Sequence, residues 1–464
     1  MKPLHELSLT EASAGIARRR FSPVEYLDAL RTRAEDVGGK VNAIVRPLWD
    51  EAREQAVKAG RRIARNGPRS ALDGLPVGLK DIIDLAGHPT TCHSRILLDN
   101  QKSADAAVVA KLRAAGAIFP AKLATHEFAI GGPAFDLPFP PARNPWNTAH
   151  HPGGSSSGSG AAVGASILPA ALGTDTGGSV RHPASHCGII GMKATYGLVS
   201  RRGVFPLAFT LDHVGPMTRT VADNALLLSM MAGHDAADPG SAAHKPENYA
   251  RQMKKGLKGL TIGYVRHFHE KDQPASTEMA AALDAAAKLL AKEGAKIKTI
   301  TLPSLTEFAG VNRAILMSEA AAIHGKWLRE RPGDYANITL RRLLPGLFMR
   351  AEDYVQAQRR RRELVAAVEA AFAEVDLLLT ASSMDAACKI DDPEAVELTY
   401  PRQARTPFNV TGHPAMTMMC GISKVEGLPL SLQLVGPSFG EAAIYRAAAA
   451  YERAAPWKDL RPAL

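Results

Sequence analysis

Serines and glycines are concentrated in one stretch of this chain, HPGGSSSGSGAAVGASILPAALGTDTGGSVR, which runs from residue 151 to residue 181. Residues 151–180 contain eight glycines and six serines, and the apolar run AAVGASILPAAL separates two polar ends. A flexible Gly/Ser tether has no reason to contain such a run. The pattern predicts a loop, a buried helix and a second glycine-rich turn. Such turns bring backbone N–H groups close to a ligand, so we interpret the stretch as a site where serine hydroxyls meet an oxyanion cradle.

A serine hydroxyl needs a base within hydrogen-bond reach, and one way to supply it is a nucleophile elbow. Residues 154–158, GSSSG, match the G-x-S-x-G pattern with Ser156 as the nucleophile, and His413 is an available partner. The elbow requires a buried strand directly before it. Because Pro145 and Pro152 interrupt the preceding residues, that strand is missing and we disfavour this design.

A lysine base is the other way to activate a serine. Lys80 lies inside the apolar segment 75–85, LPVGLKDIIDL, which is typical of a buried strand. Burial disfavours the charged ammonium and lowers the pKa of a lysine, as a general base requires. A lysine that extends from a strand edge to solvent, or that pairs with Asp81 or Asp84, is the structural alternative and stays open at this point.

Composition limits the class of protein. The chain has 464 residues, of which 46% are hydrophobic and 22% are charged, as in ordinary globular proteins. The four cysteines are scattered, with no CxxC pair and no HExxH motif, so we expect neither disulfides nor a metal site. The N-terminus lacks the apolar core of a signal peptide, and no apolar run is long enough to span a membrane. We expect a cytoplasmic protein without a membrane partner.

The formal net charge is +10, which raises the question of nucleic-acid binding. The densest basic cluster, residues 359–362, lies in a helical pattern with apolar residues at three- and four-residue spacing. We interpret this cluster as a solvated helix face, and we do not expect a nucleic-acid partner. Basic charge can still attract anionic substrates.

The elements that must position these residues alternate between helix and strand. Residues 1–66 are predicted to be helical, with an N-cap at Ser8 or Thr10 and a second helix that opens at Ser22. Further on, short apolar runs and helical patterns follow one another, and Gly116 is a predicted helix C-cap. The predicted strands are 75–85, 117–121, 257–265, 295–302, 375–382 and the segment GLPLSLQLVGPSF. This order predicts α/β layering.

Long motifs in the chain resemble those of the amidase signature family. They are GLPVGLKDIID, GGSSSGSG and GTDTGGSVRHPASHCGIIGMKATYG, followed by LDHVGPMTRTVAD, TPFNVTGHPAMTM and LPLSLQLVG, so the resemblance covers almost the whole chain. It implies an α/β fold: one large domain, 1–464, with a central mixed β-sheet covered by helices on both faces. Residues 1–66 would be its helical N-terminal part, 75–235 the signature core and 305–370 a helical elaboration on the substrate side.

The resemblance also implies a catalytic triad. By motif the acylated serine is Ser179, the relay serine held through a cis peptide is Ser155, and the base is Lys80. Between the two serines lie 23 residues, the interval of the family pattern. The backbone N–H groups of the same turn would form the oxyanion hole: Thr176, Gly177, Gly178 and Ser179. Supporting roles are expected for Ser156, which would help to hold Ser155, and for Asp175 and Arg181, which would brace the loop.

Several positions depart from the family pattern: Ser157 replaces a glycine, and Ile82, Cys92, His93, His182, His186, Ala194 and Ala381 are also unusual. None of them is one of the three catalytic positions. The unusual histidines could line the pocket, but we favour a structural role for each. Aromatic wall candidates in the variable segments 93–102, 126–143 and 305–360 are Phe128, Phe135, Phe139 and Phe348.

The function that the resemblance implies is hydrolysis of a carboxamide C–N bond, which yields a carboxylate and ammonia or an amine. We expect a small-molecule amide substrate and no cofactor, and a homodimer is compatible with the sequence. The alternative is the amide-hydrolysing subunit of a tRNA-dependent amidotransferase, which shares the signature. The basic net charge favours this alternative, whereas the segment TYPRQARTPFNVTGHPA looks more like freestanding amidases.

Overall fold

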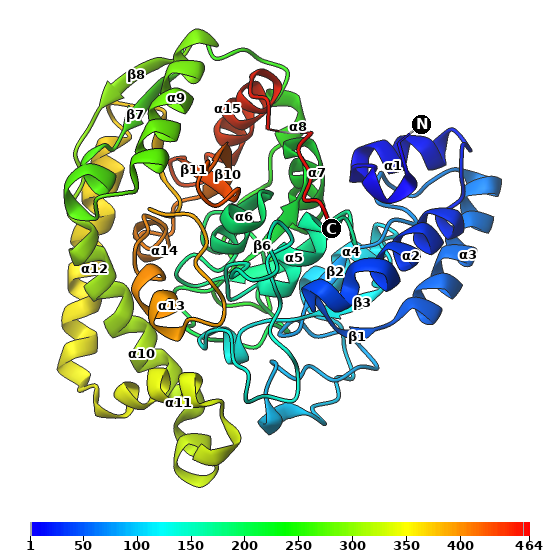
Figure 1. Cartoon of the computed structure of the whole chain (residues 1–464), viewed down its shortest axis with the longest axis horizontal. Helices are drawn as coiled ribbons and strands as arrows, with labels where there is room; N and C mark the ends of the chain where they lie inside the picture. The colour runs from blue at the N-terminus through cyan, green and yellow to red at the C-terminus, as the bar shows by residue number, and fades with distance from the viewer. Residues whose placement is uncertain (1, 458) are drawn as a thin grey trace.

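A single mixed sheet forms the centre of the computed structural model, which describes residues 2–457 and 459–464 (Figure 1). Its eleven strands follow the order β1-β3-β2-β4-β6-β5-β10-β11-β9-β7-β8. The strands are β1 (Ile44–Pro47), β2 (Gly78–Lys80), β3 (Ala121–Leu123), β4 (Ala170–Asp175), β5 (Ile190–Lys193), β6 (His213–Thr218), β7 (Thr261–Tyr264), β8 (Lys296–Thr299), β9 (Leu377–Ala381), β10 (Ala415–Ile422) and β11 (Pro429–Val435). The predicted α/β fold is confirmed.

Strand directions change along the sheet. Strand β2 lies between β3 and β4 and is parallel to both, whereas β4 pairs with β6 in antiparallel fashion. The antiparallel pairs continue through β5, β10, β11 and β9, and β9, β7 and β8 are again parallel. The sheet is therefore mixed, as predicted, and the short strand β2 is held on both edges.

Helices cover both faces of the sheet. They are α1 (Leu9–Ala17), α2 (Pro23–Val41), α3 (Trp49–Asn66), α4 (Ala107–Ala114), α5 (Ser157–Gly164), α6 (Arg181–Cys187), α7 (Val221–Met231), α8 (Tyr249–Gln252), α9 (Thr277–Lys292), α10 (Leu305–Glu330), α11 (Asn337–Leu343), α12 (Ala351–Ala371), α13 (Pro393–Thr399), α14 (Pro407–Val410) and α15 (Glu441–Ala454). Side chains alternate across a strand, and in β4 Leu172 joins one core with α4 and α7, whereas Ala171 joins another with α5. Both faces of β4 are thus buried.

The serine-rich stretch folds differently from its prediction. Its apolar run is not one buried helix, because α5 ends at Gly164 and the second half of the run becomes strand β4. Ser166 has a left-handed φ of 58°, and Pro169, which lacks an N–H, precedes the strand. The run therefore turns back, and its second half enters the sheet between β2 and β6. Strand β4 carries the chain to the second glycine-rich turn.

The N-terminal region contains a strand that we did not predict. Helices α1 and α2 begin where expected, with Ser8 and Ser22 as N-caps in capping boxes, and Thr10 lies inside α1. Between α2 and α3, however, β1 pairs with β3 at the edge of the sheet. The helical prediction for 1–66 misses this strand.

The predicted strand boundaries also need correction. Strand β2 occupies only three residues of the segment 75–85, and β3 begins at residue 121, where the predicted strand 117–121 ends. Helix α4 ends at the C-cap Ala115, so Gly116, with a φ of 97°, follows the cap instead of forming it. Strands β7, β8, β9 and β11 lie within their predicted segments.

The segment 305–370 forms α10, α11 and most of α12, which lie on the side of the molecule opposite α1, α2 and α3 (Figure 1). The arginine cluster 359–362 lies on α12, where Arg361 donates to the carbonyls of Val410 and Thr210 at 2.6 and 2.9 Å. This arginine fastens the helix to the core, so the cluster is not entirely a solvated face. Within residues 2–457 and 459–464, no helix has the length and apolar character needed to cross a membrane.

Candidate active site

Lys80 ends the short strand β2 and is completely buried. Its Nζ donates to Ser155 Oγ and to Thr174 Oγ1, each at 2.8 Å. Burial lowers the pKa of the ammonium to about 7, although the negative charges of Asp175 and Asp212 act in the opposite direction. A base that loses its proton near neutral pH is what proton abstraction requires.

The structural alternatives for Lys80 are not realised. The Asp81 carboxylate pairs with Lys122 at 2.9 Å and accepts from the Thr91 hydroxyl. Asp84 pairs with Lys102 at 3.6 Å. The fully buried Lys80 also cannot extend to solvent. Its second hydroxyl partner, Thr174 on β4, is a site residue that we did not predict. Thr174 lies in the motif GTDTGGSVR, but the motif alone does not show that this residue faces Lys80.

Ser155 is held by its backbone. The Gly154–Ser155 peptide bond is cis. The Ser155 carbonyl accepts from the His126 N–H and from Thr125 Oγ1, both at 3.0 Å. These bonds fix the backbone so that the Ser155 hydroxyl points to Lys80. Ser155 is only 1% exposed.

Ser156 joins the two ends of the serine-rich stretch. Its Oγ donates to the Thr174 carbonyl and accepts from the Thr174 N–H, both at 3.2 Å. Its backbone N–H donates to the Ser179 carbonyl at 3.2 Å. A loop, not a strand, precedes Ser156, and His413 pairs with Glu369 at 3.0 Å. The nucleophile-elbow design therefore has no structural support.

Asp175 and Arg181 form a buried ion pair with neither side chain accessible. The carboxylate accepts from Arg181 Nη2 at 2.9 Å and from Asn409 Nδ2 at 2.8 Å. Burial alone would raise the pKa of Asp175, but the charge and hydrogen bonds of Arg181 lower it far below its usual range. The same carboxylate accepts from the Gly178 and Val180 N–H groups at 2.8 and 3.1 Å, so it braces the whole turn.

This brace changes the expected oxyanion hole. The Gly178 N–H is engaged by Asp175, so in this conformation it cannot also donate to an oxyanion. Across residues 2–457 and 459–464, the N–H groups of Thr176, Gly177 and Ser179 have no protein acceptor. Gly178 has a φ of 124°, a conformation that other residues rarely adopt. Three of the four predicted donors therefore remain available.

The nucleophile candidate Ser179 is 3% exposed at the end of this turn. Among the described residues its Oγ makes no hydrogen bond, so no direct bond links it to Ser155. The structure thus brings Lys80 and Ser155 into contact and joins the backbone of Ser179 to Ser156.

A cavity of about 520 Å³ adjoins this arrangement. Thr174 and Thr176 belong to its wall, together with Asp212, whose pKa burial raises to about 6. Four aromatic residues were predicted as wall candidates, and none of them lines this cavity: Phe128, Phe135, Phe139 and Phe348. Phe128 is core, whereas Phe135 and Phe348 are exposed. The aromatic lining comes instead from Tyr196, which lies in the motif that ends in KATYG, and from Phe205 and Phe209; none of the three is among the predicted wall residues.

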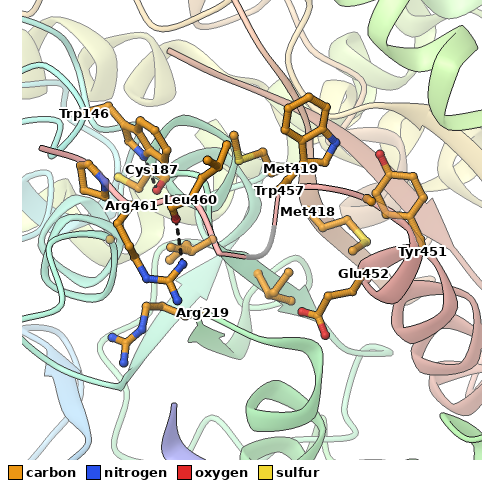
Figure 2. Close-up of a pocket in the computed structure, with 16 residues that line it drawn as sticks. Trp146, Cys187, Arg219, Met418, Met419, Tyr451, Glu452, Trp457, Leu460 and Arg461 are labelled. Carbon is orange, nitrogen blue, oxygen red and sulfur yellow. Dashed lines mark hydrogen bonds between the residues drawn. The ribbon is translucent and has the colours of Figure 1, made fainter. Parts of the chain in front are cut away.

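A second pocket lies where the C-terminal segment packs near the end of α6 (Figure 2). Figure 2 shows Trp146 and Cys187 on one side of it and Met418 and Tyr451 on the other. The Trp146 indole N–H donates to the Cys187 carbonyl at 2.9 Å. None of the predicted catalytic residues lines this pocket, so it is not the candidate active site.

The chain is similar to known proteins over almost its whole length. The family model Amidase matches residues 25–445. The chain is 36% identical to a glutamyl-tRNA(Gln) amidotransferase subunit of Roseiflexus castenholzii, over 100% of this chain and 98% of that protein. It is 37% identical to the same subunit of Geobacter metallireducens, over 98% of both chains.

Two solved structures share the fold. Peptide amidase from Stenotrophomonas maltophilia has a TM-score of 0.88 and 27% identity, over 99% of each chain. A chain from a vestigial protein complex, described as revealing the origins of an s-triazine catabolic enzyme, has a TM-score of 0.91 and 30% identity, over 96% of this chain and 98% of that one. The protein belongs to the amidase signature family. It is an enzyme of the class that cleaves amide C–N bonds.

Proposed function

We propose that the protein hydrolyses a carboxamide through an acyl-enzyme on Ser179. The Ser179 oxygen attacks the amide carbonyl carbon, its proton passes to Ser155 Oγ, and the Ser155 proton passes to Lys80 Nζ. When the tetrahedral intermediate collapses, the C–N bond breaks and the proton returns through Ser155 to the leaving nitrogen. Water then attacks the acyl-enzyme by the same relay and releases the carboxylate and Ser179.

The observation that carries this proposal is the buried contact of 2.8 Å between Lys80 Nζ and Ser155 Oγ. With a pKa of about 7, a large fraction of Lys80 is neutral at physiological pH and can accept the proton. The backbone N–H groups of Thr176, Gly177 and Ser179 have no acceptor among the described residues, which supports their proposed role as donors to the developing oxyanion. One such donor contributes about 10²–10³-fold to the rate in other enzymes.

Fluorophosphonate labelling followed by peptide mass spectrometry tests the nucleophile without a known substrate. We expect one adduct, on Ser179, and none in the Ser179→Ala variant. An adduct on Ser156 would instead support the nucleophile elbow. The Ser156→Ala variant is the matched control, because it removes a neighbouring hydroxyl and should still be labelled.

The protein acts either as a freestanding amidase or as a subunit of a larger complex, and observations favour each. The sequence favours a freestanding amidase, and the likeness to a peptide amidase structure supports that interpretation. The curated relatives support our alternative, the amide-hydrolysing subunit of a tRNA-dependent amidotransferase, more strongly, because they are named as subunits of glutamyl-tRNA(Gln) amidotransferases and match over the whole chain length. A small-molecule amide is the substrate in both cases.

Gel filtration of the native protein from its source separates the two settings. Co-elution with other polypeptides, together with glutamine hydrolysis that depends on them, would support the amidotransferase setting. Elution alone as a monomer or homodimer with full amide hydrolysis would support the freestanding amidase. A cytoplasmic location is part of the proposal, and the free thiols of all four cysteines are compatible with a reducing compartment.

A further inference from the structure

Asn312 is a polar residue on the buried face of α10. It lies between Phe308 and Ile315 at the spacing that places all three on one side of a helix, and both apolar neighbours are fully buried. Asn312 itself is 8% exposed. A buried amide is costly unless it forms hydrogen bonds, so its side chain needs a partner inside the protein.

That partner is the glycine-rich turn that carries Ser179. Asn312 Nδ2 donates to the Thr176 carbonyl at 3.3 Å. Asn312 Oδ1 also lies against the turn, 3.6 Å from the position that a Cβ on Gly177 would take. The Asn312 side chain forms no other hydrogen bond within residues 2–457 and 459–464. Helix α10 thus holds the peptide group between Thr176 and Gly177 through this one amide.

The bond to Asn312 fixes the direction of the Gly177 N–H. The carbonyl and the N–H of one trans peptide lie in a plane and point in opposite directions. Among the described residues the cis bond is Gly154–Ser155, so the peptide between Thr176 and Gly177 is trans. With its carbonyl on Asn312, this peptide directs the Gly177 N–H away from α10, where it has no acceptor in the described part of the chain.

Two neighbouring peptides of the turn are held in the same way. The Asp175 carbonyl accepts at 3.1 Å from Nδ2 of Asn409 on α14, which lies beside α10 (Figure 1). The Gly178 carbonyl accepts from the His182 N–H at 2.6 Å. In each case the N–H of the following residue points away from the group that holds the carbonyl. Each available donor of the proposed oxyanion hole therefore follows a carbonyl with a partner of its own.

Asn312 is the one of these three partners that can be replaced alone. Asn409 also accepts from Arg181 Nη2 and donates to the Asp175 carboxylate, so its loss would disturb the buried ion pair. The partner in His182 is a backbone N–H, which a change of side chain leaves in place. A substitution of Asn312 therefore reports on the orientation of a single peptide group.

We propose that Asn312 is a positioning residue of the active site, which orients the Gly177 N–H towards the oxyanion that forms on the substrate carbonyl. This inference rests on the proposed function, because it gives one donor of the proposed oxyanion hole its direction. The negative charge on the carbonyl oxygen develops only as the transition state is reached. A misdirected donor therefore lowers kcat and leaves KM almost unchanged.

Saturation kinetics of fluorophosphonate labelling test this role without a known substrate. The phosphoryl oxygen of the probe takes the place of the oxyanion, so the maximal rate of Ser179 labelling reports on the donors. In Asn312→Leu, which cannot donate, we expect this rate to fall by about tenfold or more, whereas the half-saturating probe concentration should change by less than about threefold. The control is Ser318→Ala, which removes a hydroxyl that bonds only to the Ala314 carbonyl within α10, and it should keep both values within about twofold.

The outcomes separate this inference from the proposed function. Labelling of Asn312→Leu at the wild-type maximal rate would overturn the positioning role and leave Ser179 as the nucleophile. A higher half-saturating concentration with an unchanged maximal rate would also overturn it, because Asn312 would then contribute to binding alone. The absence of a Ser179 adduct in the wild-type enzyme would overturn the function itself. If Asn312→Leu does not fold, as judged by thermal unfolding, Asn312→Asp decides the question, since its ionised carboxylate has the same shape and cannot donate.

Discussion

Lys80 Nζ lies 2.8 Å from Ser155 Oγ, although the two residues are separated by 75 positions in the chain. The contact is formed because β2 lies beside β4 in the sheet and the Ser155 loop packs over the end of both strands. Both partners are buried, the lysine completely and the serine to 1% exposure. Burial lowers the pKa of Lys80 to about 7, which supports the role of base that we propose for it.

Replacing the lysine should abolish most of the activity. We expect Lys80→Met to lower kcat for amide hydrolysis by about 10²–10⁴-fold, because the general base is lost while the buried volume is kept. Ammonia release measures the effect. Lys102→Met is the control, since that lysine pairs with Asp84 at 3.6 Å near the surface, and it should retain activity. Full activity of Lys80→Met would exclude the lysine-base mechanism.

The pH dependence should follow the ionisation of Lys80. Its pKa is lowered to about 7 by burial, and only the neutral form accepts a proton. We therefore expect kcat/KM to fall tenfold per pH unit below about pH 7 and to level off above it. A profile measured from pH 5 to 9 checks this expectation. A profile that stays flat across pH 7, or that decreases as the pH rises through 7, would contradict it.

Breaking the Asp175–Arg181 pair should destabilise the protein. Asp175→Asn leaves the Arg181 guanidinium buried without its counter-charge, and we expect the free energy of unfolding to fall by about 3–5 kcal/mol. Denaturant unfolding followed by circular dichroism measures this change. In contrast, Glu35→Gln breaks an exposed pair with Arg31 and should cost less than about 1 kcal/mol. Equal stability of the two variants would show that the Asp175–Arg181 ion pair does not stabilise the fold.

The two glycines of the turn should respond differently to alanine. Gly178→Ala requires a side chain at a φ of 124° and 2.6 Å from Arg405 Nε, so we expect a loss of stability of about 1–3 kcal/mol or more and loss of activity. At Gly177 a Cβ would meet only Asn312 Oδ1 at 3.6 Å, which is ordinary contact. Thermal unfolding of both variants decides the matter. A Gly177→Ala variant as unstable as Gly178→Ala would show that the φ of Gly178 is not the cause.

Some features of the fold follow from short segments and could be predicted. The caps Ser8 and Ser22 act through bonds within a few residues, so they can be predicted from the sequence alone. Strand β9 lies in an apolar run that marks burial on both faces. Strand β1 has only four residues, and it is a strand because it pairs with β3. This pairing depends on a distant segment, so the local sequence did not predict the strand.

The sequence by itself determined the identity of the catalytic candidates, because Lys80, Ser155 and Ser179 lie in long local motifs. Only the tertiary structure decided their environment. The low pKa of Lys80 arises from burial, and the engagement of the Gly178 N–H arises from the orientation of Asp175. Likewise, His126 and His186 lie far apart in the chain, and the fold packs both of their rings against His151. Burial, charge and hydrogen-bond partners depend on distant residues, and a local motif cannot encode them.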